Sequence, residues 1–345
     1  MRIASYSRAI SRRTLGVSLT VVVCSLTWMT PGKSVRAEDK PPAPEEVTLE
    51  CKDGLQMKAT YFAGTKGKET VPVIILHGWK ENRKDYAGLA QYLQTQFGHA
   101  VLLPDMRGHG ESTKIKRMGF KDEIVDAGKF RPTDFDQLVN DVCGSAAGVQ
   151  PAVRGEMKQF LMEKHNSQLL NIDKLCLIGS ELGATVSIKS AANDWSWPDL
   201  AGRKQGRDVK ALFLISPESN FKGLNAIKDL DDPSVQREMS IFFMAGKNGP
   251  AAKDAERMYA KLKPYHVEPP KDEIADKKDL FFWQFDTPLQ GSKLLAVSPL
   301  KGHDASSADK TDRDVNYRDL VAGFIELRLV KKDYRWALRK LPGQE

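Results

Sequence analysis

Apolar residues along this chain recur with two different periods, and the changes between them mark out the expected secondary structure. Residues 47–51 and 56–62 alternate apolar with polar positions on either side of Asp53-Gly54, which predicts two half-buried strands joined by a hairpin turn. Residues 71–76 are an unbroken, mostly β-branched apolar run, typical of a strand buried on both faces. The same reasoning predicts strands at 99–103, 174–178, 209–215, 240–245 and 280–285, and a weaker one at 293–297.

Helical spacing of apolar residues fills most of the intervals between these strands. It predicts helices at 86–97, 134–147, 156–170, 251–262 and 317–330. Strands that alternate with helices in this way predict the α/β class, with a mostly parallel central sheet and helices on both of its faces. Two polar stretches, 114–132 and 194–208, interrupt the alternation, and either could form a small cap above a cleft.

The N-terminal residues carry a different pattern. An apolar run at 15–29 is followed by small or aliphatic residues at 34–37 and preceded by four arginines: Arg2, Arg8, Arg12 and Arg13. This order predicts a secretory signal peptide at 1–37 that is cleaved after Ala37, and therefore an exported protein, periplasmic or secreted. The apolar run is shorter than the roughly 20 residues of a membrane-spanning helix, and a retained N-terminal anchor is the alternative.

Charge is concentrated in the same N-terminal segment. The whole chain has a formal net charge of +7, but residues 1–37 contain six of its 52 Lys and Arg residues and none of its 45 Asp and Glu residues. The rest, with 46 basic and 45 acidic residues, is close to neutral, so its net charge favours neither nucleic acid nor an anionic membrane as a partner. The Pro-rich residues 38–46 predict an extended linker, and residues 47–345 a single domain without a membrane span.

The sequence contains no clear motif for a nucleotide cofactor, a metal site or a set of disulfides. No predicted strand is followed by G-x-G-x-x-G or by a phosphate-binding loop, which predicts no nucleotide cofactor. The histidines are scattered without the spacing of metal ligands, so no metal site is predicted. Cleavage would remove Cys24 and leave Cys51, Cys143 and Cys176. This odd number is no disulfide framework, although an oxidising compartment would allow one bridge.

Three short motifs stand at the ends of predicted strands, where a parallel sheet collects its functional residues. His77-Gly78-Trp79 follows the strand at 71–76. The segment 105–112, Asp-Met-Arg-Gly-His-Gly-Glu-Ser, follows the next strand, and its glycines allow the chain to reverse close to the sheet. Gly179-Ser180-Glu181-Leu182-Gly183 follows the strand at 174–178 and has the spacing of a sharp strand-to-helix turn with small flanking residues.

In this order and placement, the three motifs resemble those of the α/β-hydrolase superfamily. The resemblance covers nearly the whole chain after the signal peptide and implies the α/β-hydrolase fold with a small cap insertion. It also implies a small-molecule ligand or substrate in a cleft at the carboxyl ends of the strands. In the family, a nucleophile occupies the middle of the third motif, and the backbone N–H groups that match Trp79 and Leu182 bind an oxyanion.

The chain departs from the family pattern at the nucleophile. The middle residue of the third motif is Glu181, where active serine hydrolases have serine. A carboxylate that attacked an ester would form a high-energy anhydride, but family members with Asp there displace halide or open epoxides through an alkyl ester. Ser180 is the other candidate nucleophile. Shifting the motif by one residue would, however, place the branched Ile178 and Leu182 where the turn needs small residues.

The other two members of a triad also differ from the family pattern. The acid usually lies in the turn where this chain has Gly249. Some relatives carry the acid one strand earlier, which nominates Glu218; a solvated glutamate at the loop edge is the alternative. The family's histidine follows the last strand. His303 fits that position if the last strand lies at 293–297, and is an ordinary loop histidine if it lies at 280–285.

These departures lead to a principal hypothesis and an alternative. Loss of the nucleophile and the acid together favours an exported α/β-hydrolase-fold protein that binds a ligand or serves another non-hydrolytic role. The members of a triad act as a unit, so the acid has little function once the nucleophile is gone. The alternative is an active hydrolase acting on an ester, an epoxide or a haloalkane, with Glu181 or Ser180 as the nucleophile, assisted by His303 and Glu218.

Paired tryptophans in the second polar insertion point to a third class of function. Trp195 and Trp197 lie in a Pro-containing loop and could form a platform for a peptide or another protein surface. Tryptophans in such loops are more often packed into the protein. Burial of the two rings distinguishes these interpretations.

Overall fold

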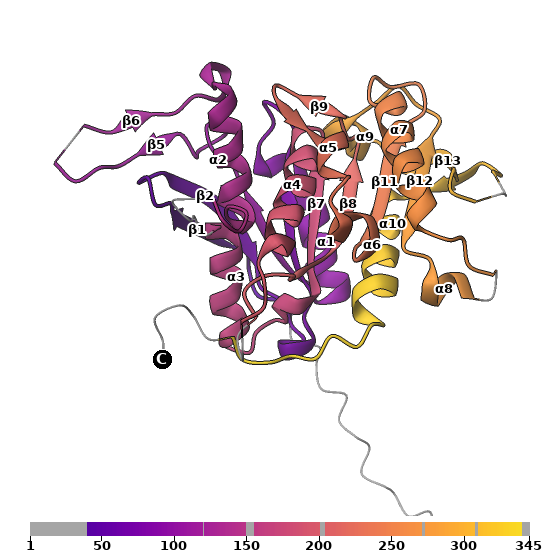
Figure 1. The fold of residues 1–345 in the computed structure, drawn as a ribbon, viewed down its shortest axis with the longest axis horizontal. Helices are drawn as coiled ribbons and strands as arrows, with labels where there is room; N and C mark the ends of the chain where they lie inside the picture. Colours follow the sequence, from indigo (N-terminus) through magenta and orange to yellow (C-terminus); the bar gives the residue numbers. More distant parts are fainter. Residues whose placement is uncertain are drawn as a thin grey trace, which may run out of the picture. The chain divides into compact units, whose positions relative to one another are not determined.

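A ten-stranded sheet runs through the part of the chain that the computed structural model describes, residues 40–119, 121–149, 155–200, 204–270, 273–307 and 310–339 (Figure 1). Pro41–Glu345 forms one compact unit. The predicted signal peptide and Cys24 lie outside the described residues. Within those described, no helix is both long and apolar enough to cross a bilayer.

The strand order of the sheet places its parallel part in the centre. In spatial order the strands are β1 (Glu45–Glu50), β2 (Gln56–Phe62), β4 (Ala100–Pro104), β3 (Pro72–Leu76), β7 (Leu175–Ser180), β8 (Val209–Ile215), β11 (Ser240–Gly246), β12 (Leu280–Phe285), β13 (Leu300–Asp304) and β14 (Arg313–Val315). Neighbours from β4 to β12 pair in parallel, and the pairs outside this range are antiparallel. The carboxyl ends of the parallel strands therefore share one edge of the sheet.

The unbroken apolar runs give two cores, one on each face of the sheet. In β3, Ile74 and Leu76 belong to one buried cluster, whereas Val73 and Ile75 belong to the other. Successive side chains of a strand project to opposite faces, so an apolar residue at every position buries both faces.

Helices cover both cores. The first cluster contains residues of α2 (Pro132–Cys143), α3 (Glu156–Asn166), α4 (Leu182–Ser196), α5 (Ala226–Asp229), α6 (Pro233–Arg237) and α7 (Ala252–Leu262). The second contains residues of α1 (Ala87–Phe97), α9 (Gly291–Ala296) and α10 (Tyr317–Ile325). A three-layer α/β/α arrangement results, which confirms the predicted α/β class with a mostly parallel central sheet and helices on both of its faces.

Short elements complete the described chain. Two small hairpins are formed by β5 (Lys114–Ile115) with β6 (Glu123–Ile124), and by β9 (Asn220–Phe221) with β10 (Leu224–Asn225). The remaining helical turns are η1 (Gly67–Glu69), η2 (Arg83–Tyr86), η3 (Ala127–Lys129), η4 (Ile172–Lys174), η5 (Lys263–Tyr265), α8 (Ile274–Lys277) and the π-helical η7 (Glu326–Val330).

Several sequence-based boundaries differ from the structure: the helices predicted at 134–147 and 156–170, for example, span Pro132–Cys143 and Glu156–Asn166. The strand predicted at 293–297 is wrong, because this segment is part of helix α9. The adjacent Leu294 and Leu295 both enter the same core cluster, which a helix allows and the alternation of a strand does not. In addition, β1 begins at Glu45, two residues inside the segment predicted as a linker, since Glu45 and Glu46 pair with Tyr61 and Thr60 of β2.

Candidate active site

The turn from β7 to α4, called the elbow here, places Glu181 at its apex. Glu181 has φ 48° and ψ −113°, a positive-φ conformation that residues other than glycine rarely adopt. Its flanks allow no side chain: a Cβ added to Gly179 would lie 2.3 Å from the Gly183 carbonyl oxygen, and one added to Gly183 would lie 2.3 Å from that of Leu76. These two close approaches fix which residue is the apex, because only glycine fits on either side.

Ser180 is not the exposed residue of this turn. It is the last residue of β7 and is completely buried. The structure therefore places Ser180 beneath the elbow, away from its apex.

The carboxylate of Glu181 lies between two glycines. A Cβ added to Gly78, in the turn after β3, would lie 2.8 Å from Glu181 Oε2. A Cβ added to Gly291, at the start of α9, would lie 2.5 Å from Glu181 Oε1. Both glycines also border the carboxylate of Glu81. Two carboxyl groups therefore share the space between the turn after β3 and the start of α9.

The Glu81 carboxylate accepts hydrogen bonds from three separate segments of the chain. Its Oε2 accepts hydrogen bonds from the Gly78 N–H, at 2.7 Å, and from the Tyr86 hydroxyl. Its Oε1 accepts from the N–H of Ser292, at 3.1 Å, and from the Ser292 hydroxyl. These contacts join the turn after β3, the end of η2 and the first turn of α9.

The two carboxyl groups have opposite pKa shifts. Burial, together with the negative charges of Glu81 and Glu218, raises the pKa of Glu181 to about 7, against the opposing effect of Lys293. Burial would also raise the pKa of Glu81, but the hydrogen bonds from Ser292, Tyr86 and Gly78 outweigh it and lower that pKa. Near neutral pH, Glu81 is therefore ionised and Glu181 is in part protonated, a separation of roles typical of acid–base pairs.

The two predicted oxyanion donors lie on either side of this pair. Leu182 is the first residue of α4, so its N–H has no carbonyl partner within the helix. Trp79 directly follows Gly78, and its half-buried ring packs among His109, Phe135 and Phe221 at centroid distances of 5.1, 5.9 and 5.4 Å. The Lys222 ammonium lies 4.0 Å from the centre of the Trp79 ring.

Gly249 occupies the acid position of a triad, and backbone carbonyl oxygens crowd the place where a side chain would lie. A Cβ added to Gly249 would lie 3.0 Å from the Pro288 carbonyl oxygen and 3.3 Å from that of Gly246. An aspartate there would have to place its carboxylate near these carbonyl oxygens, which repel it. The other candidate, Glu218, is half-buried beyond the end of β8, and its charge acts on Glu181. Burial and the charge of Asp254 raise the pKa of Glu218 itself.

His303 does not lie beside Glu181. It sits on β13, where it pairs with Gln284 of β12, and its Nδ1 lies 2.9 Å from Asp312 Oδ1. Four inter-strand spacings of about 4.8 Å separate β13 from β7, which is about 19 Å across the sheet. The interpretation in which the last strand lies at 293–297 and presents His303 at its end is therefore wrong. The last parallel strand is β12, and Gly291 stands in the segment that follows it.

Sequence reasoning missed Glu81 and the loop from β12 to α9. The strand at 280–285 is the more strongly apolar of the two candidates, and following its carboxyl end leads directly to Gly291 and Ser292. Glu81 gives no such signal. It is one charged residue in a turn, and only its contacts with Ser292, 211 residues later, show what it does.

The tryptophan pair does not lie over this site. Trp195 and Trp197 are at the far end of α4, which begins at the elbow and is 15 residues long, or about 22 Å. Both rings are half-buried, and their indole N–H groups donate to the Val209 and Ser145 carbonyl oxygens at 2.7 and 2.9 Å. The expectation that the 194–208 insertion caps the cleft is therefore wrong, and the rings are packed into the body rather than presented as a platform.

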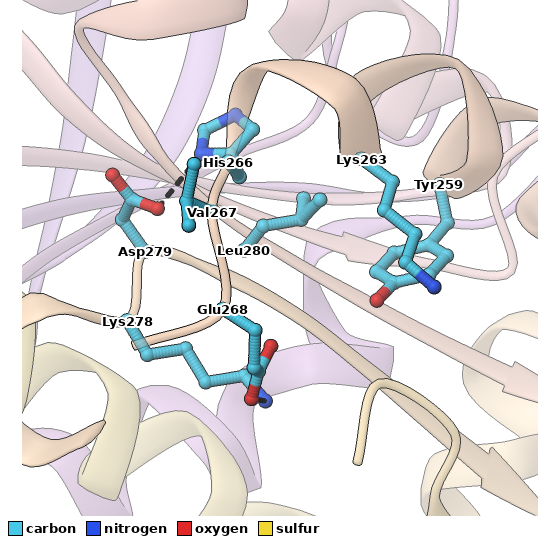
Figure 2. Close-up of a pocket in the computed structure, with 8 residues that line it drawn as sticks. All are labelled: Tyr259, Lys263, His266, Val267, Glu268, Lys278, Asp279 and Leu280. Atoms are coloured by element: carbon cyan, nitrogen blue, oxygen red, sulfur yellow. Dashed lines mark hydrogen bonds and ion pairs between the residues drawn. The ribbon is translucent and has the colours of Figure 1, made fainter. Parts of the chain in front are cut away.

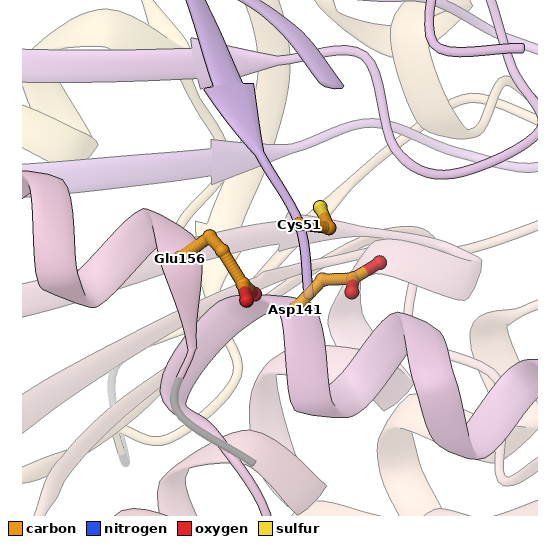
Figure 3. A group of neighbouring side chains, drawn as sticks. All are labelled: Cys51, Asp141 and Glu156. Carbon is orange, nitrogen blue, oxygen red and sulfur yellow. The ribbon is translucent and has the colours of Figure 1, made fainter. Parts of the chain in front are cut away.

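Among the described residues, the three cysteines and their surroundings show no second reactive centre. Cys51, Cys143 and Cys176 are buried and unbridged. Cys51 lies near Asp141 and Glu156, with ligand atoms all within 4.8 Å of one another (Figure 3). Both oxygens of Asp141 accept hydrogen bonds from Arg107, each at 2.9 Å, and burial raises the pKa of the Cys51 thiol. Metal ligation needs a thiolate and free carboxylate oxygens, so these residues fit a buried ion pair better than a metal centre.

A surface hollow of about 390 Å³ lies at the opposite edge of the sheet (Figure 2). It is near the first residue of β12, whereas the elbow faces the carboxyl ends of the strands. Its polar groups pair with one another: His266 Nδ1 lies 2.7 Å from Asp279 Oδ1, and the Lys278 ammonium donates to Glu268 at 2.8 Å. The hollow is therefore separate from the candidate site.

Comparison with known proteins supports the fold. The family described as alpha/beta hydrolase fold matches residues 71–294. An esterase of Pyrococcus furiosus is similar in structure, with a TM-score of 0.52, 14% identity, and coverage of 83% of this chain and 91% of that one. A Pyrobaculum calidifontis esterase has a TM-score of 0.44 and 12% identity, covering 71% and 76% of the two chains. No curated protein matches the chain in sequence.

Proposed function

Because the chain belongs to the α/β-hydrolase fold family, we propose that it is an exported member whose elbow binds a small-molecule ligand and does not hydrolyse esters through an acyl-enzyme. The observation that carries the proposal is the residue at the elbow apex. Glu181 replaces the serine, and its carboxyl is held between Gly78 and Gly291 beside a second carboxyl, Glu81. Acyl transfer needs a hydroxyl or thiol at this position and a base to take its proton.

The surroundings of Glu181 also support a non-hydrolytic role. The triad acid is replaced by Gly249, whose neighbours are backbone carbonyl oxygens. The only histidine nominated for the triad, His303, lies on β13, four strands across the sheet from β7. A partly protonated Glu181 can instead donate a hydrogen bond to a ligand, while the N–H groups of Trp79 and Leu182 offer further donors.

A second candidate function rests on the strained backbone of the elbow. Glu181 keeps the positive φ of a nucleophile turn, and such strain tends to persist at functional sites. In this reaction a Glu181 oxygen would attack an alkyl carbon of an epoxide or haloalkane, and the carbon–oxygen or carbon–halogen bond would break. Water would then hydrolyse the resulting ester at its carbonyl carbon. Glu218 is the residue whose charge reaches Glu181 and that could activate this water.

One panel of assays separates these functions. Purified protein is exposed to a fluorophosphonate probe, short p-nitrophenyl esters, epoxides and haloalkanes, with Glu181→Gln and Ser180→Ala in parallel. We expect no labelling and no turnover from protein whose circular dichroism shows it to be folded. Epoxide or haloalkane turnover that disappears in Glu181→Gln would replace the proposal with the alkyl-ester mechanism. Probe labelling that disappears in Ser180→Ala would contradict the assignment of the apex.

Export is supported by the order of basic, apolar and small residues at 1–37. Expression with a C-terminal tag, followed by fractionation and mass spectrometry of the exported form, tests it. We expect a mature N-terminus at Glu38. A protein that retains residue 1 and remains in the membrane fraction would support the anchor instead.

A further inference from the structure

A two-stranded hairpin projects from the carboxyl-terminal edge of the sheet. It consists of β5 and β6, and Figure 1 shows it reaching outward on the side of the sheet that ends in β1 and β2. Its base is held firmly. Ile115 is buried and bridges to Leu55, and the Lys116 N–H donates to the Gly54 carbonyl oxygen at 2.9 Å. The hairpin is therefore a fixed projection of the domain.

The outer part of this hairpin exposes apolar side chains. Met118 is fully exposed, at 101%, and Ile124 is 65% exposed. Single exposed apolar residues are common on soluble proteins and need no explanation. Met118, however, lies in the turn that joins β5 to β6 of a projecting hairpin, and its full exposure means that no described residue covers it.

Positive charge surrounds the exposed methionine. Residues 113–131 contain six Lys and Arg residues and three Asp and Glu residues. The remainder of the chain after residue 37 contains 40 basic and 42 acidic residues, so the positive charge outside the signal peptide gathers in this short segment. Lys116 and Lys121 are exposed on either side of Met118, and Arg117 pairs with Glu123 at 3.6 Å.

An anionic membrane surface fits this combination better than a folded protein does. A protein partner would need a pocket shaped for a protruding methionine, with acidic groups placed around it. A lipid surface adapts to a convex tip: its headgroups bind the lysines and its acyl region receives the apolar side chain. Neither attraction alone holds a protein on a membrane, and stable attachment needs both.

We propose that the β5–β6 hairpin docks the protein on an anionic lipid surface, with Met118 inserted among the headgroups and Lys116 and Lys121 against the lipid phosphates. The docking does not depend on the ligand or chemistry of Glu181. It would hold the carboxyl edge of the sheet, which carries both the hairpin and the elbow, close to the membrane.

Flotation with lipid vesicles tests the proposal. The chain from residue 38 onward is used, because the apolar run at 15–29 could bind vesicles by itself, and Pro41–Glu345 is a compact unit of its own. We expect binding to vesicles of equimolar phosphatidylglycerol and phosphatidylcholine, weaker binding to phosphatidylcholine alone, and release at high salt. Met118→Asp and the double change Lys116→Glu with Lys121→Glu should each reduce binding about tenfold.

Matched changes elsewhere on the surface provide the controls. Val267→Asp alters an apolar residue that is 88% exposed and far from the hairpin, and Lys247→Glu with Lys253→Glu reverses two exposed charges near α7. We expect both to bind vesicles like the unchanged protein, and all variants to keep their melting temperature. No binding to either vesicle, or equal losses in hairpin and control variants, would overturn the proposal. Binding to an acidic protein without binding to vesicles would do so as well.

Discussion

Glu181 occupies the position of a nucleophile but is surrounded by groups that hold a proton on it. Burial and the charge of Glu81 are the two largest effects that raise its pKa to about 7, and Lys293 opposes them. A carboxyl group in this state donates a hydrogen bond as readily as it accepts one. The chemistry of the elbow therefore depends on Glu81, which the sequence motifs do not include.

Changing Glu81 should be visible in the titration of its neighbour. We expect Glu81→Gln to lower the pKa of Glu181, because the amide removes the nearest negative charge. Carbon-13 NMR of labelled glutamate side chains, followed between pH 4 and pH 9, measures this shift. An unchanged titration of Glu181 in Glu81→Gln would show that burial and the remaining charges, not Glu81, set its proton affinity.

The raised pKa of Glu181 also predicts how stability depends on pH. Between its unfolded pKa of 4.5 and its folded pKa of about 7, the native state binds more protons than the unfolded state, so this group makes stability fall as pH rises. Glu181→Gln should therefore have nearly the stability of the unchanged protein at pH 5 and exceed it at pH 8. Urea unfolding at the two pH values checks this, with the exposed Glu50→Gln as the control.

At the scale of single residues, the sequence could predict the apex of the elbow but not its partners. The glycines at 179 and 183 place Glu181 by local geometry, because any side chain there meets backbone within one turn. The contact of Glu81 with Ser292 depends on how strands far apart in sequence come together. A local pattern does not contain that information.

At the scale of elements, the elbow forms where the end of β7, the first turn of α4 and the end of β3 pack closely against one another. Gly183→Ala would place a Cβ 2.3 Å from the Leu76 carbonyl oxygen, so we expect it to destabilise the protein by about 1–3 kcal/mol. Gly323→Ala in α10 is the matched control. It meets no atom within 4 Å and should stabilise the helix by up to about 1 kcal/mol. Thermal unfolding of the two variants distinguishes them, and equal effects would mean that the elbow relaxes freely.

Periodicity predicted most elements because the parallel strands are apolar at every position and the longer helices are amphipathic. The ranges of β2, β8 and β12 agree with the prediction residue by residue. The short helix α9 could not be distinguished from a strand, since its six residues make less than two turns. The two interpretations of His303 depended on this segment, and neither holds, because His303 lies on β13, a strand that the sequence did not predict.

At the scale of the whole molecule, residues 331–339 form a C-terminal strap across the amino-terminal edge of the sheet. The Tyr334 carbonyl oxygen accepts from the Asn171 side chain at 2.7 Å, and His165 Nε2 lies 2.8 Å from the Ala337 carbonyl oxygen. At its end, the Arg339 guanidinium pairs with Asp173, at 3.0 Å, and with the fully buried Asp208. The strap connects elements that are distant in sequence.

Removing the arginine at the end of the strap should weaken the entire fold. Breaking a buried ion pair costs about 3–5 kcal/mol, and Lys158, which still pairs with Asp208 at 2.7 Å, should limit the loss for Arg339→Ala to the lower part of that range. Denaturant unfolding measures it. Arg335→Ala, whose side chain is 90% exposed, should change stability by less than about 0.5 kcal/mol. Similar values for the two variants would show that the strap is only loosely attached.

The strap also affects when the domain can complete its folding during synthesis. Arg339 is synthesised 131 residues after Asp208 and 166 residues after Asp173, which at about 5–20 residues per second is about 7 to 33 seconds. Throughout that interval the two carboxylates lack one of their cations, and the amino-terminal edge of the sheet remains open. Under the export that we propose, a chain that closes this late would stay available to a machinery that threads unfolded polypeptide. The ion pair that completes the domain thus also determines when folding can finish.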